Sequence, residues 1–190
     1  MFDLDAFVAD CRAALRESTP EVAVRELVER AVAEPADVER ALGTPSVGGV
    51  ATLHRSPELT ILKVVWAPGM AIHPHDHRMW AVIGLYGGRE DNTFYRRSPE
   101  GLVVAGQKAL ATRDAALLGK NVVHAVTNPL RAFTGAIHVY GGDFFAMPRS
   151  EWTPDALEER PYDVEHTMRA FAEANERWRA ECVAASDVKR

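Results

Sequence analysis

The sequence has few cysteines, no long apolar stretch and no excess of positive charge. Cys11 and Cys182 are the only cysteines among 190 residues, so a disulfide framework is excluded and a reducing compartment is suitable. No apolar run approaches the roughly 20 residues of a membrane span. The 22 basic and 27 acidic residues give a net charge of −5, which provides no electrostatic footprint for nucleic acid or an anionic membrane.

The start of the chain, MFDLDAFVADC, is acidic and lacks the basic region and the long apolar segment of a secretory signal. We therefore expect a cytoplasmic protein with neither a nucleic-acid nor a membrane partner. Apolar residues make up 47% and charged residues 26% of the chain, as is typical of soluble globular domains.

Hydrophobic periodicity divides the chain into three zones. Residues 1–45 have apolar side chains at helical spacing, interrupted by Pro20 and Pro35. Residues 47–147 contain short β-branched and aromatic runs separated by Gly, Pro and Asn. Residues 148–190 are polar and helical again, with an amphipathic stretch over 165–183. This pattern predicts one mainly β domain over residues 1–190, a barrel with α-helices at both ends.

Histidines are concentrated in the β zone, and three of them alternate in GMAIHPHDHRMW, residues 69–80. Alternate residues of a strand share a face, so at least two of His73, His75 and His77 are expected to converge. Crowded imidazoles repel one another when protonated, and a divalent metal ion bound to their neutral nitrogens removes that repulsion. A solvent-exposed polar edge is the other interpretation, because this spacing alone is weak evidence.

The wider pattern resembles the cupins, which are double-stranded β-helix barrels. The stretch from Gly69 to His77, followed by Gly88, resembles their first motif, and NVVHAVTN at 121–128 resembles their second. In that family the two motifs supply three histidines to one metal ion. The resemblance implies a double-stranded β-helix fold and the ligands His75, His77 and His124.

A ligand that many cupins have is missing from this chain. Many cupins carry a glutamate ligand four or five residues after the second histidine, where this chain has Ala81 and Val82. A site with three neutral ligands keeps the full charge of the metal ion, and it has free coordination positions for an anionic substrate and oxygen. It differs in this from a site of two histidines and one carboxylate. Glu90 lies too far along the chain to be a ligand, and we expect it to be structural or at a turn. His73 is expected at the rim, on the same face as the ligands.

A narrower resemblance lies in AIHVY at 136–140, which is similar to the SLHxY strand of cysteine dioxygenases and related thiol dioxygenases. In that family the histidine orients the tyrosine beside the metal, and the pair positions substrate and oxygen. The resemblance therefore implies catalytic roles for His138 and Tyr140. The serine that usually begins this strand is Ala136 here, so the outer end of the hydrogen-bond chain is missing or replaced.

An arginine is expected to bind the substrate carboxylate, because its fork grips a carboxylate in two places. Arg55 stands where the thiol dioxygenases have that arginine. A surface role is the other interpretation of Arg55, and Arg78, Arg96 or Arg97 could supply the contact instead.

The resemblance implies a non-heme iron(II) thiol dioxygenase that uses O₂ to oxidise a small mercapto-acid or aminothiol to a sulfinate. Nickel or zinc are alternatives to Fe(2+), because imidazoles bind those metals more tightly. Two other functions stay open: a three-histidine cupin dioxygenase that cleaves carbon–carbon bonds, for example in β-diketones, and a non-catalytic cupin that binds a metal or small ligand. The sequence identifies neither the thiol nor the oligomeric state.

Overall fold

A computed structural model describes residues 1–187 of the chain. Three helices come first: α1 (Leu4–Ala14), α2 (Pro20–Ala33) and α3 (Pro35–Leu42). The carboxylate of Asp3 caps α1 by accepting a hydrogen bond from the backbone N–H of Ala6 at 2.9 Å. Prolines open α2 and α3, where a missing N–H loses no helical hydrogen bond. These helices lie where the periodicity of residues 1–45 predicts them.

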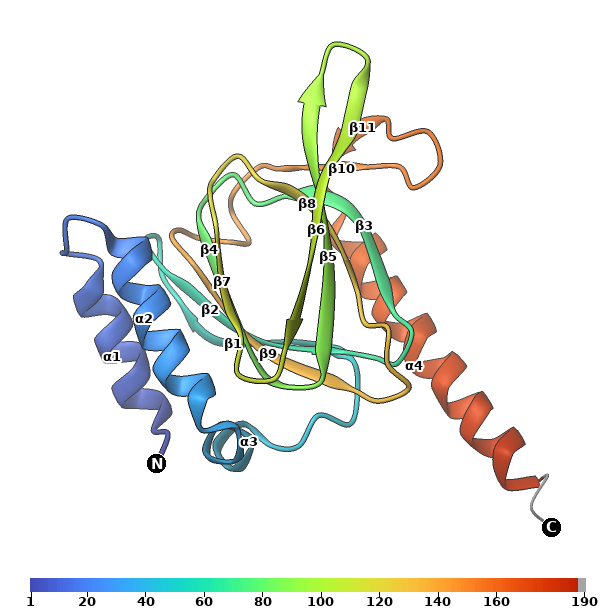
Figure 1. Cartoon of the computed structure of the whole chain (residues 1–190), viewed down its shortest axis with the longest axis horizontal. Helices are drawn as coiled ribbons and strands as arrows, with labels where there is room; N and C mark the ends of the chain where they lie inside the picture. Colours follow the sequence, from blue (N-terminus) through green and yellow to red (C-terminus); the bar gives the residue numbers. More distant parts are fainter. Residues whose placement is uncertain (188–190) are drawn as a thin grey trace.

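Two antiparallel sheets form the barrel (Figure 1). One has five strands in the order β1 (Gly49–Arg55), β2 (Thr60–Trp66), β9 (Thr134–Tyr140), β4 (Ala81–Gly87) and β7 (Ala115–Leu118). The other has six strands in the order β11 (Glu159–Pro161), β10 (Ser150–Trp152), β3 (Ala71–Asp76), β8 (Val123–Thr127), β5 (Arg89–Ser98) and β6 (Gly101–Ala111). The predicted fold class, a mainly β double-stranded β-helix barrel with helical flanks, is confirmed.

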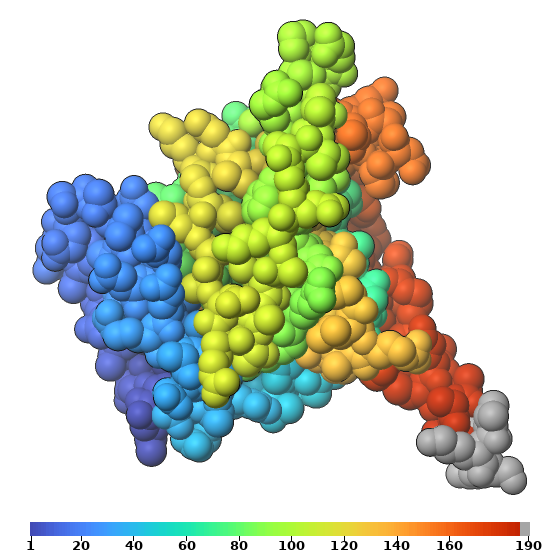
Figure 2. Space-filling view, viewed as in Figure 1, coloured from blue at the N-terminus to red at the C-terminus, as the bar shows by residue number. Residues whose placement is uncertain are grey.

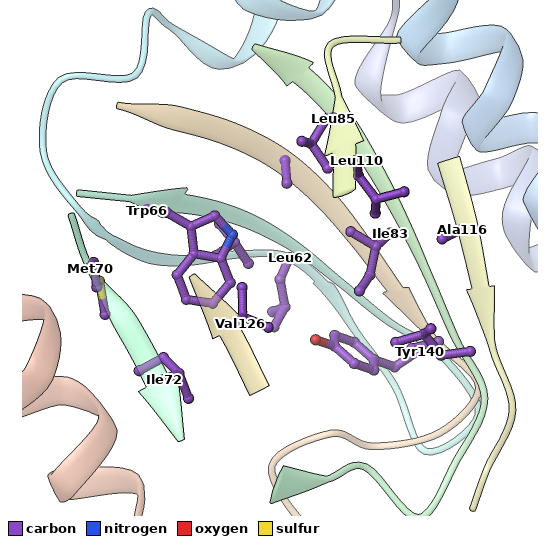
Figure 3. Packing of buried hydrophobic residues seen from close by; sticks show 14 of the residues in the cluster. Leu62, Trp66, Met70, Ile72, Ile83, Leu85, Leu110, Ala116, Val126 and Tyr140 are labelled. Carbon is purple, nitrogen blue, oxygen red and sulfur yellow. The ribbon is translucent and has the colours of Figure 1, made fainter. Parts of the chain in front are cut away.

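The central strand β9 is buried on both faces, and its alternation separates two cores. Ile137 and Val139 point to the N-terminal helices, where they pack with residues of α1 and α2. Ala136 and Tyr140 belong to the cluster inside the barrel. Figure 3 shows Tyr140 in this interior, with its hydroxyl directed toward the space enclosed by the strands. One face of β9 therefore belongs to the core beneath the N-terminal helices, and the other face lines the interior of the barrel.

The N-terminal helices cover the outer face of the five-stranded sheet (Figures 1 and 2). Contact is close at Gly84 of β4, where an added Cβ would lie 2.3 Å from Cγ1 of Val28. Because a methyl group does not fit there, α2 packs directly on the strand backbone.

The C-terminal helix α4 (Val164–Asp187) packs its first half against the barrel and extends away from it in its second half (Figure 1). The ring of Phe171 stacks on Trp66 with centroids 5.5 Å apart. The Asn175 side chain exchanges two hydrogen bonds with the backbone of Gly48, at 2.7 and 2.9 Å. Within residues 1–187, the helices include none both long and apolar enough to span a membrane.

Candidate metal centre

Three imidazoles meet inside the barrel. His75 lies near the end of β3, directly opposite His124 of β8 in the strand register, and His77 follows β3 by one residue. One ring nitrogen from each lies within 4.8 Å of the other two. The Nε2 atoms of His77 and His124 are 3.4 Å apart, a separation that fits two nitrogens bound to one ion at about 2.0–2.1 Å each. The structure thus brings together the three histidines that the motifs imply.

Hydrogen bonds to the second ring nitrogens orient two of these imidazoles. Nδ1 of His75 donates to the backbone carbonyl of His73 at 3.0 Å, and Nδ1 of His124 donates to Oδ1 of Asn92 at 2.7 Å. A proton on Nδ1 leaves the lone pair of Nε2 free to bind a metal, as is common in histidine metal sites.

Burial keeps the three imidazoles neutral. Loss of hydration lowers the pKa of His75 to about 4 and holds the pKa values of His77 and His124 well below the usual range. Coulombic repulsion from neighbouring histidines lowers the last two further. Three neutral, converging nitrogen donors fit a divalent first-row metal ion, and this donor set does not select one such metal.

A cavity of about 80 Å³ adjoins the three imidazoles. Its walls are mainly apolar and come from β2, from the strands of the other sheet, from the segment after β9 and from the start of α4, including Leu62, Val64, Ile72, Val126, Phe144, Met168 and Phe171. Its few polar groups belong to His138, Tyr140, Arg149, Tyr162 and Thr167. The cavity can therefore enclose a small ligand with an apolar body and one or two polar ends.

The predicted His138–Tyr140 pair lies against this centre. Nδ1 of His138 and the phenol oxygen of Tyr140 are 3.0 Å apart, and the Tyr140 ring meets the His77 ring edge-on with centroids 5.1 Å apart. Burial lowers the pKa of His138 to about 3 and raises the pKa of Tyr140. Both groups are consequently neutral and linked at physiological pH.

Glu90 does not lie at a turn. It is the second residue of β5, fully buried inside the barrel. Its Oε2 accepts from the indole N–H of Trp66 at 2.8 Å, and its Oε1 accepts from the Asn92 amide at 3.0 Å. Burial raises the pKa of this carboxyl. The alternation of β5, in which Arg89 and Asp91 point outward, is the sequence signal that places Glu90 and Asn92 inside.

Arg55 lies outside the residues that line the cavity. Its guanidinium is half exposed and forms a two-point ion pair with Asp143, the closer contacts being 3.0 Å. Arg78 and Arg97 both pair with Asp76, at 2.6 Å each. The structure therefore gives these arginines carboxylate partners within the chain.

Arg149 is the arginine that lines the cavity, and nothing in the sequence indicates it. It follows β9 in the segment that leads to β10, and it is 9% exposed. Its guanidinium carbon lies 3.8 Å from the ring centroid of Phe144 and 4.1 Å from that of Tyr162. One of its nitrogens donates to the Phe144 carbonyl, whereas Nε has no hydrogen-bond partner among residues 1–187.

His73 is not at the rim beside the ligands. The pairing of β3 with β8 shifts register between Ile72 and His75, so strict alternation fails at this point. The His73 ring instead lies 3.3 Å from the Glu151 carboxylate and stacks on His166 with centroids 4.6 Å apart. This cluster fastens the start of α4 to β3.

No protein-family model matches the chain. Among solved structures, the chain is similar to an rmlC-like cupin family protein with a double-stranded β-helix fold from Methanocaldococcus jannaschii, with 12% identity over 54% of this chain and 86% of that one and a TM-score of 0.44. It is also similar to a Cupin 2 conserved barrel domain protein from Salinispora arenicola, with 18% identity over 48% of this chain and 72% of that one and a TM-score of 0.40. A third similar structure is KdgF from Halomonas sp., with 16% identity over 49% of this chain and 78% of that one and a TM-score of 0.41.

Proposed function

We propose that this protein is a non-heme iron(II) dioxygenase that oxidises the thiol of a small mercapto-acid to a sulfinate with O₂. The observation that carries the proposal is the His138–Tyr140 pair placed against three converging imidazoles in a mainly apolar cavity. Iron(II) held by His75, His77 and His124 would bring thiolate and oxygen together and activate the oxygen.

Arg149 is the residue that we assign to the carboxylate of the substrate. Its side chain is held flat between two aromatic rings, so little rotamer freedom is lost when it binds an anion. No carboxylate within residues 1–187 forms an ion pair with it, unlike Arg55, which pairs with Asp143. A buried cation without such a partner favours an anionic ligand.

Tyr140 is the group that we assign to proton and hydrogen-bond control beside the sulfur. Its hydroxyl faces the interior and is linked to His138, so it is held in one orientation. The apolar wall from β2 and α4 offers water few hydrogen-bond partners, and a drier site strengthens the hydrogen bond of Tyr140 to a ligand.

Cleavage of a carbon–carbon bond in a small diketone is the second candidate. The apolar walls of the cavity favour it, because a diketone has an apolar skeleton to bury, whereas the buried Arg149 favours the anionic mercapto-acid.

Oxygen uptake by anaerobically iron-loaded protein tests the proposal against a panel of small thiols with acetylacetone included. We expect uptake with a mercapto-acid, coupled one-to-one to a sulfinate detected by mass spectrometry. Uptake with the diketone alone would assign carbon–carbon cleavage instead. Absence of uptake across the panel, with iron confirmed bound, would contradict the proposal and leave a binding protein or an enzyme with an unusual substrate.

A further inference from the structure

A buried carboxylate lies behind the His138–Tyr140 pair, on the side away from the phenol. Oε2 of Glu90 is 3.8 Å from Nε2 of His138, and that nitrogen is buried with no hydrogen-bond partner among residues 1–187. The other nitrogen of the ring, Nδ1, contacts Tyr140. One imidazole therefore stands between a phenol that faces the cavity and a carboxylate that does not.

We propose that Glu90 is the terminal proton acceptor of a relay through His138 and Tyr140, which takes the proton of the substrate thiol when the thiol binds. This inference rests on the proposed function. The thiol dioxygenases have a serine at the position of Ala136, at the outer end of this hydrogen-bond chain. Here the Glu90 carboxylate, which comes from the facing sheet, would take the place of that serine.

The proton balance is simple. The thiol proton passes to the phenol oxygen of Tyr140, the phenol proton passes to Nδ1 of His138, and the proton on Nε2 passes to Oε2 of Glu90. The sulfur keeps the electron pair of its S–H bond and becomes a thiolate, and the Glu90 carboxylate becomes a neutral acid. One negative charge thus moves from Glu90 to the ligand, and the total charge of the buried site is unchanged.

The surroundings of Glu90 suit both protonation states. Two hydrogen-bond donors, the Trp66 indole and the Asn92 amide, stabilise the carboxylate, while its burial raises the pKa and makes the neutral acid accessible. The titratable group that faces Glu90 from β9 is His138, with Tyr140 beyond it. The 3.8 Å gap must close to a hydrogen-bond length of about 2.8 Å before the proton crosses.

Asn92 connects the same carboxylate to the metal centre. Its amide N–H donates to Glu90, and its carbonyl oxygen accepts from Nδ1 of the ligand His124. Glu90 therefore places a negative charge near a centre whose three ligands are neutral, without being a ligand itself.

Counting the protons released on thiol binding tests the relay. Anaerobic iron(II)-loaded protein is titrated with 3-mercaptopropionate at about pH 7, where a free thiol is still mostly protonated. Calorimetry in two buffers of different ionisation enthalpy gives the number of protons released. We expect close to none from the wild type and close to one per site from Glu90→Gln and Tyr140→Phe.

Two features make this experiment decisive. Tyr140→Phe breaks the relay at its cavity end and leaves the partners of Glu90 in place, so it tests the relay if Glu90→Gln folds poorly. Tyr86→Phe removes a buried phenol that does not line the cavity and should release as few protons as the wild type. Infrared difference spectra should show the C=O stretch of a protonated carboxyl on thiol binding to the wild type, and no such band in Glu90→Gln.

Release of one proton by the wild type overturns the inference, and so does an absence of release from Tyr140→Phe. A parallel titration with 2-mercaptoethanol, which has no carboxylate, separates the relay from the proposed substrate. If only 2-mercaptoethanol binds, the mercapto-acid assignment fails while the proton count still tests Glu90. If neither thiol binds, both proposals fail.

Discussion

Histidine serves different purposes in this barrel according to what holds its second nitrogen. A backbone carbonyl holds His75 and an amide oxygen holds His124, so each presents Nε2 to the centre. His138 uses Nδ1 for a phenol and turns Nε2 toward a carboxylate. The residue type alone therefore does not define a role, whereas its hydrogen-bond partner does.

Removal of one ligand should release the metal. We expect His124→Ala to lose most bound iron after dialysis, because two imidazoles hold the ion far more weakly than three. Tyr140→Phe is the matched variant, since it should keep one iron per chain and reduce kcat by roughly 10²–10⁴-fold, the range of a lost acid–base group. Elemental analysis and steady-state oxygen uptake check both results. Stoichiometric iron in His124→Ala would contradict the ligand assignment.

The two candidate arginines can be distinguished by substrate affinity. Arg149→Met should raise KM for a mercapto-acid roughly 10- to 100-fold, because a hydrogen-bonded charge contact of about 1.5–3 kcal/mol is lost. Arg55→Met should leave KM within about twofold, since its guanidinium is bound to Asp143 at a partly exposed surface. The reverse pattern would restore Arg55 as the carboxylate-binding residue.

The sequence could indicate the three converging histidines, which are the proposed ligands, because short motifs place them. His75, His77 and His124 follow strand spacing that the printed residues display. The roles proposed for Arg149 and Glu90 could not be identified in this way, since these residues come from a loop and a facing sheet that meet the centre only in three dimensions. For His73 the spacing gave a wrong placement, because a register shift in β3 breaks the alternation on which that prediction relied.

At the level of secondary structure, the helix α4 forms part of the cavity wall through its first half. Val164, Thr167, Met168 and Phe171 line the cavity, and Phe171 stacks on Trp66. Its amphipathic pattern predicts the helix but not the surface that it covers. The short strands β10 and β11 were not predicted, because three-residue segments show no usable periodicity.

Loss of the α4 contact should destabilise the protein and open its cavity. Phe171→Ala should lower the free energy of unfolding by about 3–5 kcal/mol, as is usual for a buried phenylalanine. Val183→Ala, at an exposed position of the same helix, should change it by less than about 0.5 kcal/mol. Denaturant unfolding of both variants checks this prediction. Equal stability of the two would show that α4 is not fastened to the barrel.

Across the whole molecule, the four buried imidazoles should make stability depend on pH. The ordinary pKa of histidine is about 6.5, and burial lowers it to about 4 for His75 and about 3 for His138, with His77 and His124 also lowered. The unfolded chain therefore binds more protons than the folded chain below about pH 6.5, so stability is full above that pH and falls as the pH drops toward 4.

Each imidazole contributes up to about 1.4 kcal/mol per pH unit in that interval. Burial raises the pKa of Glu90, so its contribution to stability falls as the pH rises and offsets part of the contribution of one imidazole. Denaturant unfolding of chelator-treated protein between about pH 6.5 and 4 measures the slope, and His138→Phe should reduce it. A stability that stays constant over this interval would refute the prediction.

Because β9 lies between β2 and β4, it sets the order in which the strands of the five-stranded sheet can pair. It pairs with β2 along its whole length and with β4 from Gly135 to Tyr140, although β2 and β4 precede it by many residues in the chain. The five-stranded sheet therefore stays open until residues 134–140 have been synthesised and inserted. Until then β2 and β4 have unpaired edges, which makes early chains prone to wrong strand pairing. The strand that carries His138 and Tyr140 is also the one whose late arrival closes the sheet.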